Sequence, residues 1–232
     1  MLNNYDRIAS NYDRLSRLIF GKSIVRAQQV LLPFITSPAR VLIVGGGTGW
    51  ILEEIAKRCS FGLAIDYVEI SSNMLDLARK RDFKGNRVTF VHAGIEDYAA
   101  PAQYDVVMTP FLFDNFSRER AHEVFEKLDK MLKSGALWLF TDFHIDQNLS
   151  RIWQKALLRS MYIFFKNISH VEADQLPDMS RHFANNDYFL TFESFYFGRF
   201  IRSAAYRKSG DRSASPAENK PLVENKDRQQ DQ

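Results

Sequence analysis

The sequence predicts an α/β fold of the doubly wound, Rossmann-like type, with a mostly parallel seven-stranded sheet and an antiparallel C-terminal hairpin. Two observations predict the parallel part: apolar, β-rich runs alternate with helical patterns over residues 40–142, and a glycine-rich turn follows the first run. Such alternation pairs strands in parallel through right-handed crossovers. The aromatic residues within 187–207 predict the hairpin. The 232 residues, 45% of them hydrophobic, suffice for one domain.

The elements follow in order along the chain. Apolar residues at helical spacing before Pro33 indicate one or two amphipathic helices. The expected strands are 40–44, 62–69, 87–91, 104–109 and 136–142, and the helices between them are 50–58, 72–80 and 117–132. An aromatic-rich helix then runs to about Lys166, an irregular segment contains Pro177, and the hairpin follows.

Three parts of the chain are expected: an N-terminal helical lid in residues 1–35, the main domain in 36–208 and a tail in 209–232. Beyond Lys208 the composition becomes Ser, Asp, Asn, Gln, Lys and Pro, with almost no apolar residues. So few apolar groups cannot offset the entropy lost on ordering. We therefore predict a disordered tail.

The net charge, the cysteine count and the length of the apolar stretches limit the partners and the location that we expect for this protein. The net charge of +3 is small for this length, and no basic stripe interleaved with aromatics stands out, so charge implies no nucleic acid. The single cysteine, Cys59, lies in an apolar-periodic pattern and is expected to pack rather than react. No stretch approaches the ~18 apolar residues of a membrane span, so we expect a cytoplasmic protein.

The turn Gly-Gly-Gly-Thr-Gly at residues 45–49 directly follows the first strand. Glycines there let the backbone approach a ligand and open a helix whose N–H groups face it. NAD enzymes, nucleotide enzymes and plain tight turns all use such a turn. Glu69, twenty residues after Gly49 at the end of the second strand, adds specificity because a carboxylate can accept hydrogen bonds from both ribose hydroxyls. Asp66 competes for this role, but it lies inside the strand pattern.

These segments resemble the class I S-adenosylmethionine-dependent methyltransferases, and most closely the ubiquinone/menaquinone-biosynthesis C-methyltransferases. Residues 5–9 with Tyr12-Asp13 are similar to that family's N-terminal lid, and residues 45–49 to its glycine turn. Residues 69–78 match the acid and the Ser- and Met-containing helix start, while 111–116 and 142–143 follow the fourth and fifth strands. The similarity covers about residues 4–145.

The resemblance implies S-adenosyl-L-methionine as the cofactor. Thr48 and the glycines would hold its methionine part, Glu69 its ribose, and the residues after the third strand its adenine. The full expected set is Gly45, Gly46, Gly47, Thr48, Gly49, Glu69, Ile70, Met74, Gly94, Ile95, Glu96, Pro110, Phe111 and Tyr12. Two residues depart from the family's pattern: Ile43 and Gly94 stand where many relatives carry a polar side chain.

Few catalytic residues are expected, because methyl transfer from a sulfonium is an in-line displacement that needs positioning and, for some acceptors, a base. Asp114-Asn115 stands where the quinone-methylating relatives carry Arg-Asn, and Asp114 is a candidate base or acceptor orienter. Its alternative role is that of a loop acid or helix N-cap before Ser117. His144, near Asp142 at the end of the fifth strand, is a second candidate base. The histidines lack metal-ligand spacing, so no metal is predicted.

The expected acceptor is small or lipophilic, with an aromatic or quinone-like molecule as the candidate. This expectation rests on six aromatic residues that follow the active edge of the sheet: Phe113, Phe116, Trp153, Tyr162, Phe164 and Phe165. Core packing is the alternative. The other readings are a non-catalytic S-adenosylmethionine-binding protein and a nicotinamide-dependent oxidoreductase. A monomer, a homodimer and a peripheral membrane contact all remain open.

Overall fold

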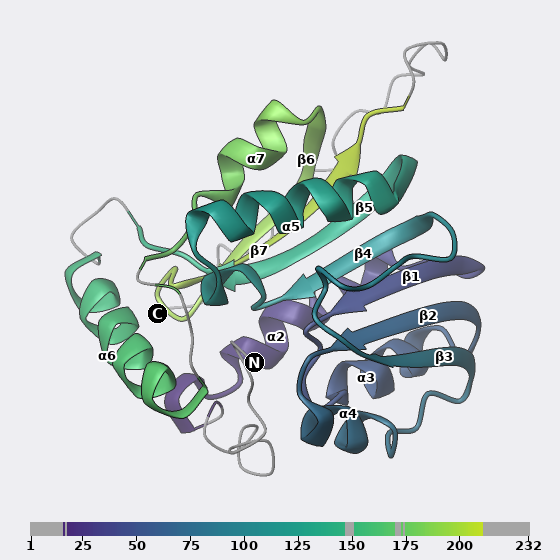
Figure 1. The fold of residues 1–232 in the computed structure, drawn as a ribbon, viewed down its shortest axis with the longest axis horizontal. Coiled ribbons are helices and arrows are strands. Elements are labelled where there is room, and N and C mark those ends of the chain that lie inside the picture. The colour runs from purple at the N-terminus through teal and green to yellow at the C-terminus, as the bar shows by residue number, and fades with distance from the viewer. Residues whose placement is uncertain (1–15, 17, 147–150, 170–172, 174, 211–232) are drawn as a thin grey trace, which may run out of the picture.

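The computed structural model describes residues 16, 18–146, 151–169, 173 and 175–210. Within residues 151–169 it describes the side chains up to residue 163. One sheet organises them, in the strand order β3-β2-β1-β4-β5-β7-β6 (Figure 1). Neighbouring strands pair in parallel from β3 to β5, and β7 pairs antiparallel with both β5 and β6. The predicted fold class is confirmed.

The strands match the apolar runs of the sequence. They are β1 (Ala39–Val44), β2 (Phe61–Glu69), β3 (Gly85–His92), β4 (Tyr104–Pro110), β5 (Leu132–Phe143), β6 (Tyr188–Tyr196) and β7 (Ile201–Lys208). Most strand ends differ from the expected ones by at most two residues, but β5 begins at Leu132 rather than at 136. The intervening Lys133-Ser134-Gly135 reads as a turn, but the register between β4 and β5 shifts there and accommodates it.

The helices are α2 (Ser23–Gln29), α3 (Trp50–Arg58), α4 (Ser72–Ala78), α5 (Arg118–Met131), α6 (Arg151–Ser169) and α7 (Met179–Asn185). Ser71 and Ser117 cap α4 and α5 by accepting backbone N–H groups. The irregular segment expected around Pro177 contains α7, so that interpretation was wrong in part. The predicted tail from residue 211 and residues 1–15 and 17 of the predicted lid lie outside the described residues, whereas α2 lies within the lid.

Helices cover both faces of the sheet and form two cores. On one face α5 and α7 pack on Trp138, whose ring stacks on Phe125 with centroids 4.8 Å apart. On the other face α3 and α4 pack against the buried side chains of β1 and β2. Figure 1 shows α6 standing away from these layers, beyond the carboxyl ends of β4 and β5. That edge is where ligands bind in such sheets.

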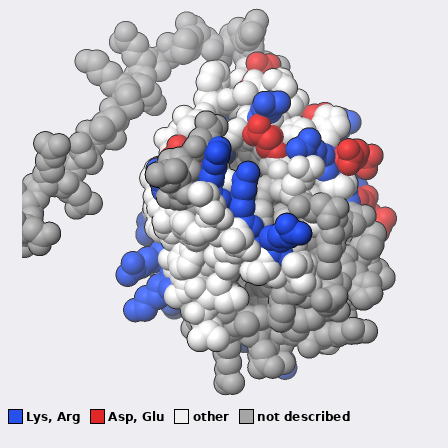
Figure 2. All heavy atoms as spheres, turned by 90° about the vertical axis from the view of Figure 1, so that its left-hand side faces the viewer, with Lys and Arg blue, Asp and Glu red and all other residues white. Residues whose placement is uncertain are grey.

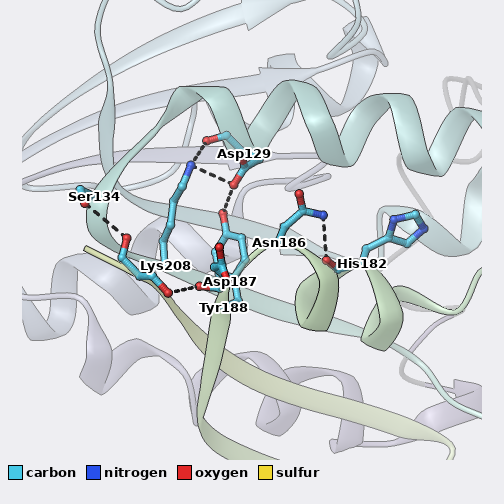
Figure 3. A network of polar contacts seen from close by, with 8 residues as sticks. Asp129, Ser134, His182, Asn186, Asp187, Tyr188 and Lys208 are labelled. Atoms are coloured by element: carbon cyan, nitrogen blue, oxygen red, sulfur yellow. Dashed lines mark hydrogen bonds and ion pairs between the residues drawn. The ribbon is translucent and has the colours of Figure 1, made fainter. Parts of the chain in front are cut away.

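Half-buried polar contacts join the C-terminal hairpin to α5 (Figure 3). The Asp129 carboxylate accepts a hydrogen bond from the Tyr188 hydroxyl at 2.7 Å and forms an ion pair with the Lys208 ammonium at 2.9 Å. The same ammonium donates to the Asp129 carbonyl. Burial and the hydrogen bond to Asp129 raise the pKa of Tyr188, which therefore donates as a neutral phenol. One carboxylate thus holds both strands of the hairpin.

Asp129→Ala should lower the free energy of unfolding by about 2–3 kcal/mol, because it leaves both the Tyr188 hydroxyl and the Lys208 ammonium without this partner. Tyr188→Phe removes one hydrogen bond and should cost about 1 kcal/mol. Urea unfolding of the two variants beside wild type measures the difference. Equal losses in the two variants would show that Asp129 does not serve both strands.

Candidate active site

A cavity lies at the carboxyl edge of the sheet, between the glycine turn after β1 and the segment after β4. It brings together most of the residues expected from the sequence. Its lining includes Gly45, Gly46, Gly47, Thr48, Glu69, Ile70, Met74, Gly94, Ile95, Glu96, Pro110, Phe111, Asp114 and Asn115. Gly49 lies behind the turn as the N-cap of α3. Tyr12 lies outside the described residues.

Close packing explains why the turn needs glycine at two positions. A Cβ atom on Gly46 would collide with the ring of Tyr67. Gly49 has φ of 76°, and a Cβ atom there would come within 2.6 Å of the Ala78 Cα. The Tyr67 hydroxyl donates to the Gly47 carbonyl at 2.9 Å. Strand β2 and helix α4 therefore hold the turn against the cavity, a role for Tyr67 that the sequence pattern did not reveal.

Glu69 is the buried acid of this cavity. One of its carboxylate oxygens accepts the Gly47 N–H and the other accepts the Ser71 N–H, each at 3.0 Å. These two bonds fix the orientation of the carboxylate. Asp66 is engaged elsewhere, with the Arg40 guanidinium at 2.7 Å and the Tyr104 hydroxyl at 2.6 Å, and does not line the cavity. The geometry therefore favours Glu69 for a ribose.

The segment after β3 forms another wall, where a Cβ atom on Gly94 would lie 3.0 Å from a Glu96 carboxylate oxygen. Glu96, two residues later, thus supplies a carboxylate close to the position where Gly94 has no side chain. Glu96 pairs with Arg120, whose guanidinium also lies 4.5 Å from the centroid of the Phe116 ring. Sequence reasoning missed Arg120, although an arginine in the first turn of a helix opposes the helix dipole and could have been noticed. Ile43 is buried in the core and does not line the cavity.

The remaining wall is apolar and comes from distant parts of the chain. It consists of Phe20, Ile24, Phe111, Phe143 and Met161, with the Gln28 side chain among them. The rings of Phe111 and Phe143 lie 5.0 Å apart, and those of Phe20 and Phe143 5.5 Å. Phe111 has φ of 51°, a strained conformation for a bulky residue, held by its N–H bond to the Thr141 carbonyl at 2.7 Å. Strain of this kind clusters at binding sites.

The aromatic residues expected to line the acceptor side are placed differently. Phe116 lines the cavity, but Phe113 is buried in the core beneath α5. Trp153 packs on Phe197 and Phe200, and Tyr162 lines a second cavity. The side chains of Phe164 and Phe165 lie outside those described. Among the described side chains, Phe116 is thus the one of these expected aromatic residues at this cavity, where Phe20, Phe111 and Phe143 also lie.

Two carboxyl groups meet at the end of β5. Asp142 is buried and accepts the N–H groups of Phe113 at 3.0 Å, Asp114 at 3.3 Å and Phe143 at 2.8 Å. Burial raises the pKa of Asp142 to about 7, and burial together with the charge of Asp142 raises the pKa of Asp114. Two buried carboxyls this close cannot both ionise readily, so they retain a proton to higher pH.

Asn115 lines the cavity and also holds the segment around Asp114 in place. Its amide donates to the carbonyls of Phe111 and Leu112 and to the Asp114 carboxylate, the last at 2.9 Å. These bonds fix the 3-10 turn Phe113–Asn115. The Asp114 side chain is thereby oriented at the cavity wall.

His144 lies apart from Asp114. It lines the second cavity, with Lys155, Arg159 and Arg202, and this cavity shares Phe143 with the first. Burial, and then the charge of Arg202, lower the pKa of His144. The structure therefore does not bring the two candidate bases together. Cys59 packs with the core beside α3, with its thiol 3.6 Å from the Ile35 carbonyl.

No helix among the described residues combines the length and the apolar character that crossing a membrane requires.

Comparisons with known proteins agree with this geometry. Residues 41–135 match the family model described as a methyltransferase domain. The chain is 32% identical over 114 residues to a malonyl-[acyl-carrier protein] O-methyltransferase of Halalkalibacterium halodurans, covering 47% of this chain and 41% of that protein. It is 27% identical over 148 residues to a ubiquinone/menaquinone biosynthesis C-methyltransferase of Rhodopseudomonas palustris, covering 60% and 58%. The chain thus spans less than half the length of the first relative.

The fold is similar to that of the N-methyltransferase NodS from Bradyrhizobium japonicum in complex with S-adenosylhomocysteine. The TM-score is 0.67 at 11% identity, covering 88% of this chain and 96% of that one. This likeness shows the fold. Residues 41–135 are similar to the methyltransferase-domain family, and the strand order is that of the Rossmann-like methyltransferase fold.

Proposed function

We propose that this protein transfers a methyl group from S-adenosylmethionine to a small, largely apolar acceptor. One observation carries the proposal: a single cavity joins the glycine turn and Glu69 to the apolar wall of Phe20, Phe111 and Phe143. A donor held at one end would therefore meet an acceptor held at the other without leaving the site. Holding both reactants together supplies much of the rate enhancement of a displacement reaction.

The residues of the donor end fit S-adenosylmethionine. The turn at Gly46 and Gly47 lines the cavity, and helix α3 begins directly after it, so the N-terminus of that helix lies next to the turn. Glu69 is oriented to accept ribose hydroxyls. Ile70, Ile95 and Leu112 offer apolar contacts for a purine ring. When bound, the cofactor supplies an electrophilic methyl group on its sulfonium.

The acceptor end supplies orientation, exclusion of water and a proton acceptor. The apolar wall excludes water, and Gln28 and Asn115 offer polar groups for orientation. Burial and the charge of Asp142 raise the pKa of Asp114, which becomes a stronger base for an acidic hydroxyl or carbon acid once it has lost its proton. The relatives named above are described as a malonyl-[acyl-carrier protein] O-methyltransferase and a ubiquinone/menaquinone biosynthesis C-methyltransferase. The aromatic wall of this chain favours an aromatic or quinone-like acceptor.

Glu69→Ala should weaken S-adenosylmethionine binding about 10- to 100-fold, because hydrogen bonds to a charged group contribute about 1.5–3 kcal/mol. Titration calorimetry with S-adenosylmethionine and S-adenosylhomocysteine measures it, with NADH as the control ligand. Asp76→Ala, which removes an exposed carboxylate of α4, should bind like wild type. Tighter binding of NADH than of either adenosyl ligand would overturn the assignment of the donor end.

The melting temperature of Asp114→Asn minus that of wild type should increase as the pH rises from about 4 to about 7. The folded carboxyl pair holds its proton more tightly than the unfolded chain does, so its stabilising contribution is full at low pH and is lost as pH rises through that window. The amide does not titrate. A difference of ~1 kcal/mol corresponds to about 2–4 °C in a domain of this size.

The same variant tests Asp114 as the base. Methyl transfer from labelled S-adenosylmethionine to a panel of quinols, phenols and malonyl thioesters identifies an acceptor first. With that acceptor, wild-type turnover should rise with pH as the pair loses its proton, and Asp114→Asn should lower turnover about 100-fold and abolish the rise. Unchanged turnover and an unchanged pH profile would assign Asp114 a purely structural role.

A further inference from the structure

We propose that helix α6 and the neighbouring residues Leu18 and Ile19 form a docking surface for an anionic lipid bilayer. The structure supports this surface through charge, exposed apolar area and the fixed orientation of α6. The docking itself does not depend on the catalytic activity. Its purpose, to deliver a lipophilic acceptor, rests on the proposed function.

The charge of α6 is one-sided. Arg151, Lys155 and Arg159 are exposed and follow one another at four-residue spacing, which places them along one stripe of the helix. The sequence of Arg151–Ser169 contains no Asp or Glu. Among the described residues, no carboxylate forms an ion pair with these three side chains. Figure 2, which views the molecule from the side of α6, shows Lys and Arg side chains gathered on this face.

Exposed apolar side chains lie beside this basic stripe. Ile152 is 69% exposed and Ile163 59% exposed, and with Ala156 they form a second row at helical spacing next to the cations. Trp153 is 40% exposed. Large aliphatic side chains on a helix with a cationic flank are typical of helices that lie in a membrane interface. A nucleic acid would use the cations but would give the isoleucines no favourable contact.

The opposite side of α6 is anchored to the protein, so the exposed stripe faces outward. The buried Gln154 side chain accepts the Asp146 N–H at 2.7 Å and donates to the Gly198 carbonyl at 2.8 Å. Leu158 and Met161 are buried in the same apolar cluster as Phe20. The helix is therefore a fixed platform, in which docking would not have to displace buried contacts.

The platform adjoins the acceptor end of the cavity. Leu18 is 83% exposed and Ile19 38% exposed, and Ile19 also lines the cavity, as does Met161 of α6. Figure 1 shows the N-terminal segment beside the distal end of α6. A bilayer in contact with α6 and Leu18 would therefore meet residues of the cavity wall. An apolar acceptor could then pass from lipid to protein with little exposure to water.

Vesicle flotation of the full chain tests the surface without any acceptor. Vesicles of equal parts phosphatidylglycerol and phosphatidylcholine should bind the protein, and vesicles of phosphatidylcholine alone should bind it much less. Lys155→Glu with Arg159→Glu should weaken binding at least ~10-fold, since each cation near an anionic surface contributes measurably. Ile152→Ser with Ile163→Ser should also weaken it.

The matched control is Lys80→Glu with Arg87→Glu, which makes the same charge change at exposed positions on α4's end and β3 and should bind like wild type. Calorimetry with S-adenosylmethionine shows that each variant is folded, and it also separates a failure of the cofactor assignment from a failure of docking. Equal binding to both vesicle types, equal losses in the control, or binding of a polyuridine strand in preference to anionic vesicles would each overturn the proposal.

Discussion

The contact on which the donor half of the site depends is the carboxylate of Glu69 with the N–H groups of Gly47 and Ser71. It joins the end of β2 to the glycine turn after β1 and to the start of α4. A buried carboxylate is costly unless it is hydrogen-bonded, and here the backbone supplies the partners before any ligand arrives. The acid is therefore pre-oriented, which lowers the conformational entropy that its side chain would lose when a ligand binds.

The sequence predicted well the strands and the grouping of the glycine turn with Glu69, because both are local in the chain. A strand buried on both faces appears as a continuous apolar run, and the turn and its acid lie at the ends of two consecutive strands. Helix Trp50–Arg58 has the predicted bounds. Helix α7 was missed because seven mixed residues after Pro177 carry too little periodic signal.

The acceptor half was harder to predict because its residues come together only in the fold. Gln28 comes from α2, Phe143 from the end of β5 and Met161 from α6, and no spacing in the sequence links them. Phe113 was expected at the cavity, but one step along the 3-10 turn directs it into the core while Asp114 faces the site. His144 follows Phe143 directly, yet it lines the other cavity.

The family match ends at residue 135, whereas most of the apolar wall comes from before residue 41 and after residue 135. The donor half is thus one continuous stretch of chain, and the acceptor half is assembled from segments that flank it. Substitutions in α2 or α6 can reshape the acceptor wall without touching Glu69 or the glycine turn. Under the proposed function, such a division lets the wall that contacts the acceptor change while the segment that contacts the methyl donor is retained.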